Sequence, residues 1–264
     1  MEKKIYKHEY FGELYYLVNV PEEYKNKKGA PMLVFLHGSG ERGKDFNLIA
    51  KNGIPKYINE GMKIPAITVC PQCPENFIWN NYVFLLKDFI EYAAKEYGAD
   101  TAKISLTGIS MGGFGTWEMA MCWPDLFRRI APICGGGTSW RTDLIKAPVW
   151  AFHGDKDQTV LPENSYEMVD ALVKQGKDAR LTIFHNVGHD SWDDAYLNTK
   201  LIEWLTAVCP LQYSRISKLK QQILSFAKPS TFVRHKFNRT NSEKNNILPL
   251  HTPLRRCDRC NTRG

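Results

Sequence analysis

Short apolar runs alternate with longer amphipathic stretches between about residue 30 and residue 208. Six runs of four or five residues are rich in apolar side chains and end near turn residues: Met32–Leu36, Ala66–Cys70, Ile104–Thr107, Ile130–Ile133, Val149–Phe152 and Leu181–Phe184. Such runs are typical of strands buried on both faces. Because strands that alternate with helices usually pair in parallel, the order predicts an α/β fold with a central, mostly parallel sheet flanked by helices.

Two segments before and between these runs add further elements. Residues 10–20 alternate apolar and polar positions after a break at Gly12, which predicts an antiparallel hairpin leading into the sheet. Residues 82–97 place apolar side chains with a period near 3.6 and charges on the opposite face, and Gly98 follows as a stop signal. This segment is therefore expected to be an amphipathic helix that crosses from one strand to the next.

The same helical pattern returns twice near the end of the apolar region. Residues 163–174 repeat it with Gly176 behind them, and residues 194–208 form the last amphipathic segment. Pro210 then interrupts the pattern. We therefore expect one domain over residues 1–209, large enough to be a catalytic domain, followed by a tail over residues 210–264.

The basic charge of the chain is concentrated in that tail. The sequence of 264 residues has 43% apolar residues and a formal charge of +7, from 35 basic and 28 acidic residues. Residues 210–264 hold 12 of the basic and 2 of the acidic residues, which leaves 23 basic and 26 acidic residues before them. The domain is thus slightly acidic, and we expect no nucleic-acid partner. The tail is too polar to fold alone and is expected to be dispensable or poorly ordered, with an anion-binding arm as the alternative.

Two features of the sequence bear on the cellular compartment of the protein. The first residues carry charges without the apolar stretch of a signal peptide, and nowhere do 18 apolar residues run together, so we expect no membrane partner. Seven cysteines are an odd number in a chain too large to need disulfides. These features favour a cytoplasmic protein, although a chain that had lost an export signal would have the same pattern.

A glycine-flanked serine follows the third predicted strand. Gly108-Ile109-Ser110-Met111-Gly112-Gly113 lies between that strand and a helix-compatible run, residues 114–122. A nucleophilic serine must protrude from a sharp, crowded turn, so glycine is needed two residues before and two residues after it. The turn also directs the amide of Met111 toward the place where an oxyanion would form. Ser110 is therefore the candidate nucleophile, and a mere turn serine is the alternative.

A serine hydroxyl needs a base, and the base needs an acid that fixes its tautomer. His189 follows the last predicted strand, and Asp155 and Asp157 follow the strand before it. The chain order Ser, Asp, His is that of the α/β-hydrolases. Since each member lies just past a strand, all three are expected at one edge of the sheet. Either aspartate could reach the imidazole.

A second oxyanion donor is expected in the loop after the first predicted strand. Residues 37–43, His-Gly-Ser-Gly-Glu-Arg-Gly, hold three glycines, which let the backbone approach a substrate closely. We assign the amide of Ser39 as the donor that acts together with the amide of Met111.

These motifs resemble the carboxylesterase branch of the α/β-hydrolases. The resemblance covers about residues 12–208 and is carried by five motifs: the glycine loop at 37–43, Cys-Pro-Gln-Cys-Pro at 70–74, Gly108–Gly113, Gly154 with Asp157 and Val160, and Gly188-His189 with Trp192. The branch includes dienelactone-hydrolase-like, polyhydroxybutyrate-depolymerase-like and feruloyl and acetyl-xylan esterase-like enzymes, often labelled predicted peptidases. The resemblance implies an α/β-hydrolase fold without a large lid, and it selects Asp157 over Asp155 as the acid.

Several other residues have alternative interpretations. His37, His153 and His185 compete with His189 as the base, but we expect the first two to hold loops in place and the third to point away. The pairs Cys70/Cys73 and Cys257/Cys260 resemble zinc ligands only weakly, because 183 residues separate them. We therefore expect neither metal nor organic cofactor. Asp190 and Asp194 are expected to be solvated or to cap a helix.

The substrate is the least constrained part of the prediction. Trp79, Trp140 and Trp192 fall in loops expected near the catalytic edge, where they would favour an aromatic or sugar ring. With the resemblance, this predicts a serine carboxylesterase acting through an acyl-enzyme, on short-acyl, feruloyl or acetyl esters of plant polysaccharide fragments. A serine peptidase acting on short peptides is the alternative, and an inactive hydrolase-fold binding protein is a third possibility.

Overall fold

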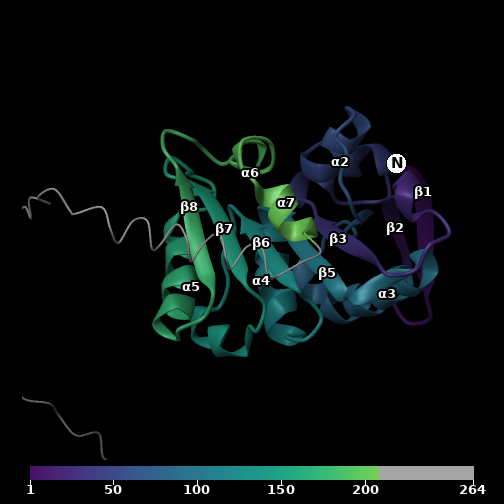
Figure 1. Ribbon diagram of the computed structural model, residues 1–264. Helices are drawn as coiled ribbons and strands as arrows, with labels where there is room; N and C mark the ends of the chain where they lie inside the picture. The colour runs from purple at the N-terminus through teal and green to yellow at the C-terminus, as the bar shows by residue number, and fades with distance from the viewer. Residues whose placement is uncertain (208–264) are drawn as a thin grey trace, which may run out of the picture. The chain divides into compact units, whose positions relative to one another are not determined.

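The computed structural model describes residues 1–207. These residues form an eight-stranded sheet in the order β1-β2-β4-β3-β5-β6-β7-β8, with helices on both faces (Figure 1). The expectations for the tail at 210–264, and for Cys257 and Cys260, lie outside the described residues.

Six of the eight strands are parallel. The strands are β1 (Glu2–His8), β2 (Gly12–Asn19), β3 (Ala30–Leu36), β4 (Ile67–Pro71), β5 (Ala99–Ile109), β6 (Arg129–Ile133), β7 (Val149–Gly154) and β8 (Ala179–Phe184). Strands β1 and β2 pair antiparallel, β2 pairs antiparallel with β4, and every pair from β4 through β8 is parallel. The carboxyl ends of β3 to β8 consequently share one edge, and the loops after β3, β5, β7 and β8 all open there.

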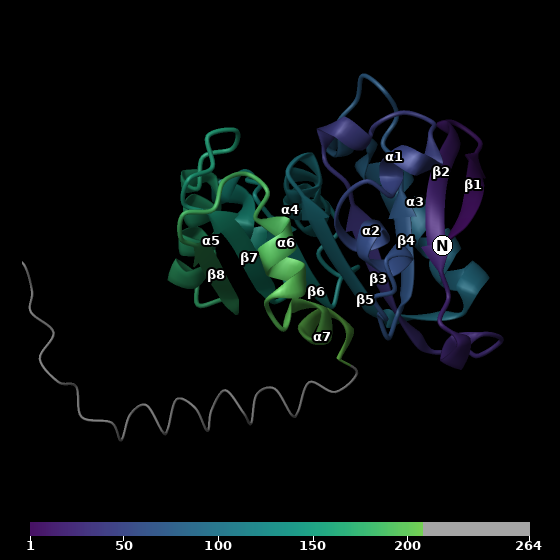
Figure 2. The same cartoon turned by 90° about the horizontal axis from the view of Figure 1, so that it is seen from above.

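The helices form two layers around the sheet (Figures 1 and 2). They are α1 (Phe46–Ile49), α2 (Gly53–Asn59), α3 (Val83–Tyr97), α4 (Met111–Cys122), α5 (Glu163–Lys174), α6 (Trp192–Leu197) and α7 (Leu201–Thr206), with short 3-10 turns η1 (Glu22–Tyr24), η2 (Ser39–Glu41), η3 (Trp79–Tyr82) and η4 (Ser139–Leu144). One core layer lies between the sheet and α3, α4 and α5. On the other face, the Tyr196 ring packs against Phe35 and Tyr57, and the Thr107 hydroxyl hydrogen-bonds the Tyr196 hydroxyl at 2.8 Å.

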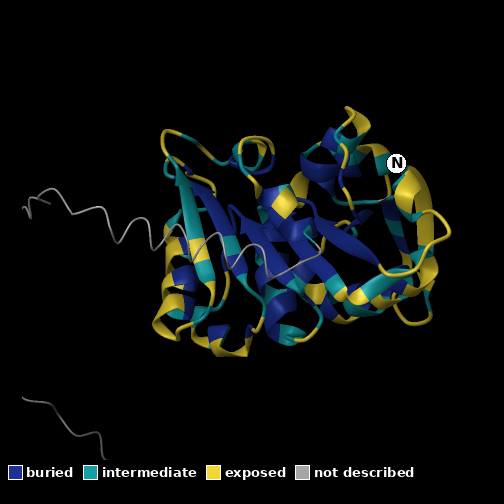
Figure 3. Ribbon diagram, in the orientation of Figure 1, coloured by how far each residue is buried: buried dark blue, intermediate teal, exposed yellow. Residues whose placement is uncertain are grey.

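The central strands are buried because they have a helical layer on each side. Every residue of β3, β4 and β6 is buried, whereas β1 at the sheet edge is mostly exposed (Figure 3). This agrees with the uninterrupted apolar runs in the sequence. Between β6 and β7 the chain forms only η4, so no separate lid is inserted there. None of the helices within residues 1–207 combines the length and apolarity needed to cross a bilayer.

Two elements differ from the sequence-based expectation. The hairpin is present, but its first strand is β1 at Glu2–His8, so the range 10–20 contains only the turn and the second strand. The single helix expected over 194–208 is divided into α6 and α7. The Thr199 hydroxyl donates to the carbonyl of Ala195 at 2.6 Å and accepts the Leu201 amide at 3.1 Å, and such side-chain bonds compete with helical bonds.

Candidate active site

Ser110 occupies a sharp turn between β5 and α4. Its backbone has φ +53° and ψ −117°, a conformation that a non-glycine residue adopts only when the surrounding structure imposes it. The Ser110 amide donates to the carbonyl of Ile133 at 3.0 Å and lies 3.3 Å from the Cys134 sulfur. These contacts with the end of β6 hold the turn, which presents the hydroxyl at the carboxyl edge of the sheet.

The turn is possible only with glycine at its flanks. A Cβ on Gly108 would lie 2.3 Å from the Gly112 carbonyl oxygen, and one on Gly112 would lie 2.0 Å from the Leu36 carbonyl oxygen. Real Cβ atoms do not approach backbone atoms that closely. The glycine spacing therefore lets β5, α4 and the end of β3 pack in contact beneath Ser110.

We expect Gly112→Ala to destabilise the domain by about 3 kcal/mol, because backbone rather than a flexible side chain must move to admit the methyl group. Thermal unfolding followed by circular dichroism measures the effect. Gly40→Ala is the matched control, since a Cβ there meets no atom within 4 Å. Its effect should stay within about 0.5 kcal/mol. Equal destabilisation by the two substitutions would contradict the packing argument.

His189 joins Ser110 to Asp157. The Nε2 atom of His189 lies 2.9 Å from the Ser110 Oγ atom, and its Nδ1 atom lies 2.7 Å from Asp157 Oδ2. An ionised carboxylate only accepts hydrogen bonds, so Nδ1 carries the proton and Nε2 is left to accept the serine hydroxyl. The three residues predicted from separate motifs are thus brought into one hydrogen-bonded line.

Asp157 is fully buried and receives four donors. Its Oδ1 atom accepts the amides of Thr159 and Val160, both at 2.9 Å, and its Oδ2 atom lies near His189 and, at 3.1 Å, near Nε2 of His153. Burial alone would raise the pKa of Asp157, but the hydrogen bonds from His189, Val160 and Thr159 outweigh it and lower the pKa below the usual value. The carboxylate is therefore ionised at neutral pH.

The alternative acid, Asp155, points to different partners. Its carboxylate lies 3.1 Å from His185 Nδ1 and accepts the Asn186 amide at 2.7 Å. The bond to His185 lowers the pKa of Asp155, and the His185 side chain is 84% exposed. The structure thus brings Asp157, and not Asp155, to His189, and it leaves His185 at the surface.

The glycine loop after β3 lies against the serine turn. A Cβ on Gly38 would be 3.7 Å from the Ser110 Cβ. His37 is buried, its Nε2 atom accepts the Cys73 amide at 2.9 Å, and its Nδ1 atom therefore donates to the Gly38 carbonyl at 2.6 Å. Burial lowers the pKa of His37 to about 4, so the ring is neutral. Since N–H and C=O oppose each other in a trans peptide, this bond turns the Ser39 amide away from His37.

A cavity of about 380 Å³ opens beside Ser110. Its walls contain the two residues whose amides were predicted to bind an oxyanion, together with apolar and polar side chains from η3 and its neighbourhood: Ser39, Arg42, Ile78, Asn80, Ser110, Met111 and Phe114. Met111 is the first residue of α4, so its amide is among those that lack a partner within the helix. Ile78, Asn80 and Phe114 were missed in the sequence, because no motif distinguishes them from core residues.

None of the three tryptophans predicted to bind substrate lines this cavity. Trp79 is fully buried, and its indole N–H donates to the His37 carbonyl at 2.9 Å, so it supports the glycine loop from below. Trp140 is 81% exposed on η4, where its neighbour Arg141 pairs with Glu118 in the second half of α4, away from Ser110. Their loop positions alone suggested a place at the cavity, but loop membership does not determine on which side of α4 a side chain lies.

Trp192 lies beside His189, outside the residues that line the cavity. Its ring packs edge-on against the His189 imidazole, with the centroids 5.7 Å apart and an interplanar angle of 86°. It is half-buried at the start of α6. Trp192 is therefore placed to restrict the movement of the His189 ring.

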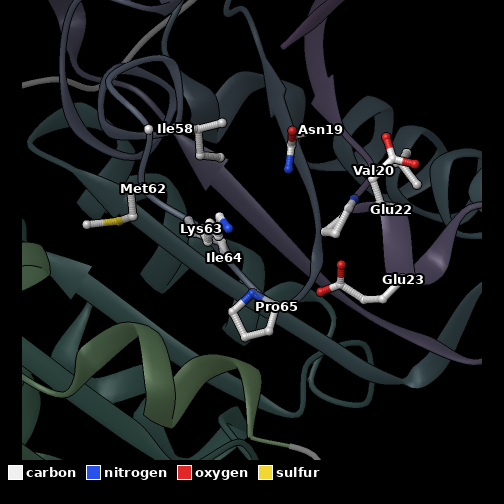
Figure 4. Close-up of a pocket in the computed structure, with 11 residues that line it drawn as sticks. Asn19, Val20, Glu22, Glu23, Ile58, Met62, Lys63, Ile64 and Pro65 are labelled. Atoms are coloured by element: carbon white, nitrogen blue, oxygen red, sulfur yellow. The ribbon is translucent and has the colours of Figure 1, made fainter.

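A larger cavity, of about 660 Å³, lies at the opposite edge of the sheet. Figure 4 shows it between Asn19 at the end of β2, Glu23, Met62 and the Lys63–Pro65 segment before β4. It contains no serine, histidine or cysteine in its walls. Its larger size is therefore no reason to assign it a role in the reaction of the hydrogen-bonded array formed by Ser110, His189 and Asp157. Within residues 1–207 no group of three metal-ligating side chains is assembled.

Comparisons with known proteins agree with the fold. Residues 138–209, which include Asp157 and His189, match the prolyl oligopeptidase family. The poly(3-hydroxyalkanoate) depolymerase C of Paucimonas lemoignei is 26% identical in an alignment of 135 residues, and the match covers 39% of this chain. The crystal structure of a thermostable esterase is 32% identical and superimposes with a TM-score of 0.69 over 77% of this chain. A feruloyl esterase module from Clostridium thermocellum, complexed with sinapinate, superimposes with a TM-score of 0.62 over 76% of this chain and 86% of its own, at 17% identity.

The chain spans only part of the more similar proteins. It covers 33% of the depolymerase and 62% of the thermostable esterase. The 17% identity to the feruloyl esterase module shows a common fold alone. The sheet order, the serine turn and these similarities together make the fold that of the α/β-hydrolases.

Proposed function

We propose that the chain is a serine esterase with the α/β-hydrolase fold, and that it hydrolyses carboxylic esters with Ser110 as nucleophile, His189 as base and Asp157 as orienting acid. The observation that carries the proposal is the continuous line of hydrogen bonds from Ser110 through His189 to a buried, ionised Asp157. The line opens on a cavity walled by the residues that supply two candidate oxyanion amides.

The proposed reaction is acyl transfer in two stages. His189 Nε2 takes the Ser110 proton while Oγ attacks the ester carbonyl, and the amides of Ser39 and Met111 stabilise the oxyanion. Protonated His189 then donates to the departing alcohol, which leaves an acyl group on Ser110. Water repeats the sequence, with His189 as base again, and releases the carboxylic acid. Asp157 holds the imidazole in the required tautomer throughout.

The cavity favours a small or flat acyl group. Ile78, Met111 and Phe114 provide apolar walls, and Asn80 and Arg42 provide hydrogen-bond donors. We therefore propose short-acyl or feruloyl esters, including acetyl and feruloyl groups on plant polysaccharide fragments, as substrates. The similarity to a poly(3-hydroxyalkanoate) depolymerase, whose name denotes a polyester substrate, supports an ester over an amide.

A serine peptidase acting on short peptides is the second candidate. The match of residues 138–209 to the prolyl oligopeptidase family favours it, since this segment contains the base and the acid. The same triad cleaves an amide when the departing amine is protonated efficiently.

Turnover of p-nitrophenyl acetate, methyl ferulate and a peptide p-nitroanilide separates the candidates. We expect kcat/KM for the better ester to exceed that for the anilide by at least about 100-fold, a difference of about 2.7 kcal/mol in transition-state stabilisation. A preference for the anilide would overturn the esterase in favour of the peptidase. Turnover of none of the three, with no difference between the wild type and Ser110→Ala, would support the binding-protein interpretation.

A further inference from the structure

We propose that His153 is a positioning residue for the acid of the array, donating its Nε2 hydrogen to Asp157 and thereby holding the carboxylate in line with His189. The proposal rests on the proposed function, because it assigns His153 a role in the same reaction. It concerns a residue that does not line the cavity beside Ser110.

The contacts of His153 determine which ring nitrogen carries the proton. His153 is fully buried on β7, four residues before Asp157. Its Nε2 atom lies 2.8 Å from the Val160 carbonyl oxygen and 3.1 Å from Asp157 Oδ2. Both neighbours are acceptors, so Nε2 must be the protonated nitrogen. The single hydrogen on Nε2 is shared between the Asp157 carboxylate and the Val160 carbonyl, which belong to the same loop after β7.

The other side of the ring is anchored to a different element. Nδ1 of His153 lies 2.7 Å from the Ser165 hydroxyl on α5, and that hydroxyl lies 3.1 Å from the Gly135 carbonyl. Burial lowers the pKa of His153, so the neutral ring accepts the serine hydrogen at Nδ1. Gly135 in turn packs against Gly113, in the first turn of the helix after Ser110. The imidazole is therefore fixed at both ends between α5 and the loop after β7.

The consequence for Asp157 is a carboxylate with a donor set on each oxygen. Oδ1 is held by the amides of Thr159 and Val160, and Oδ2 by the two histidines. Without the His153 donor, Oδ2 is held by His189 alone, the residue that takes and returns the proton in the reaction. The carboxylate could then rotate in its buried site, and a misalignment of His189 on the order of 1 Å costs about 100-fold in rate. Substrate affinity should not change, because the cavity walls are untouched.

Two substitutions of similar size separate this role from simple filling of the core. A glutamine amide reaches about as far from the backbone as Nε2 of histidine, whereas an asparagine amide reaches only about as far as Nδ1. His153→Gln can therefore keep a donor near Asp157 and Val160, while His153→Asn keeps a partner for Ser165 and loses the donor. A merely structural role would make the two variants similar, or would favour the one that preserves folding better.

The experiment measures kcat and KM for p-nitrophenyl acetate, thermal unfolding, and the low-field proton NMR signal of the hydrogen between His189 and Asp157. We expect His153→Asn to lower kcat by about 10- to 100-fold with KM within about twofold, and to weaken or shift the NMR signal. His153→Gln should recover at least about fivefold of kcat and the wild-type signal. Equal kcat and equal spectra for the two variants at comparable folding would overturn the proposal.

If His153→Asn does not fold, Ser165→Ala provides the same comparison from the far side of the ring. In this variant His153 loses its partner at Nδ1 but can still donate from Nε2, so it should hold Asp157 less firmly. We expect kcat to fall by about two- to fivefold and the NMR signal to broaden. Wild-type kcat and spectrum in Ser165→Ala would overturn the proposal. The NMR signal can be observed without turnover. A wild-type protein that shows the signal but hydrolyses no ester would contradict the proposed function. The effect of His153 on Asp157 would still be tested by comparing the signals of the variants.

Discussion

Replacing Ser110 with alanine should lower kcat for p-nitrophenyl acetate by about 10⁴-fold or more. The activity that remains would come from the oxyanion amides and substrate binding alone. The hydroxyl lies 2.9 Å from His189 Nε2, the nitrogen that would take its proton. Without it the acyl-enzyme cannot form. Steady-state kinetics measures the loss, and KM should change little because the substitution removes one oxygen atom and leaves the other cavity walls in place.

The control for this prediction is Ser139→Ala. Ser139 begins η4, next to Trp140, and takes no part in the array. It should retain wild-type kcat and unfolding temperature. Ester turnover that survives in purified Ser110→Ala at more than about a tenth of the wild-type rate would mean that another residue is the nucleophile.

Asp157→Asn should lower kcat by about 10⁴-fold, whereas Asp155→Asn should change it less than about threefold. If the asparagine oxygen keeps the Thr159 and Val160 amides, its NH₂ group faces His189 Nδ1. That nitrogen must then accept, so Nε2 carries the hydrogen and cannot take the Ser110 proton. The Asp155 carboxylate is instead hydrogen-bonded to His185 and the Asn186 amide.

Kinetics of both variants, with unfolding temperatures measured in parallel, tests the assignment. The buried position of Asp157 makes some loss of stability expected in Asp157→Asn, but the protein that remains folded should still show the loss in kcat. A large loss in Asp155→Asn with near-normal Asp157→Asn would reverse the choice of acid.

The sheet and the array were predictable because their signals are local. Buried parallel strands produce continuous apolar runs, as in Met32–Leu36, and the glycine spacing around Ser110 follows from the collisions that a Cβ would make with Leu36 and Gly112. Strand ends also position Asp157 and His189 at one edge, since all strands from β4 to β8 run in parallel.

Other features depend on contacts between distant segments, which the pattern does not contain. Trp79 and Trp140 both lie in short 3-10 turns, yet Trp79 is fully buried and Trp140 is exposed. The difference arises from packing against α4, and nothing within the loops themselves indicates it. The break between α6 and α7 depends on the Thr199 hydroxyl, in a segment whose apolar period continues through it.

His153 shows the same limit in another form. Its position in the sequence predicts that it holds a loop in place, and its bond to the Val160 carbonyl agrees with that. Its contact with the acid was not predictable, because it requires the loop after β7 to fold back over the end of its own strand. The four-residue separation of His153 and Asp157 is compatible with many loop conformations.

Labelling with a fluorophosphonate tests the central claim most directly. A nucleophilic Oγ forms a bond to phosphorus and fluoride departs, so we expect one adduct per chain, located by peptide mass mapping on Ser110 and absent from Ser110→Ala. An adduct on a different residue, or an unlabelled wild-type protein that nonetheless hydrolyses esters, would contradict the assignment of Ser110, His189 and Asp157 as the reacting array.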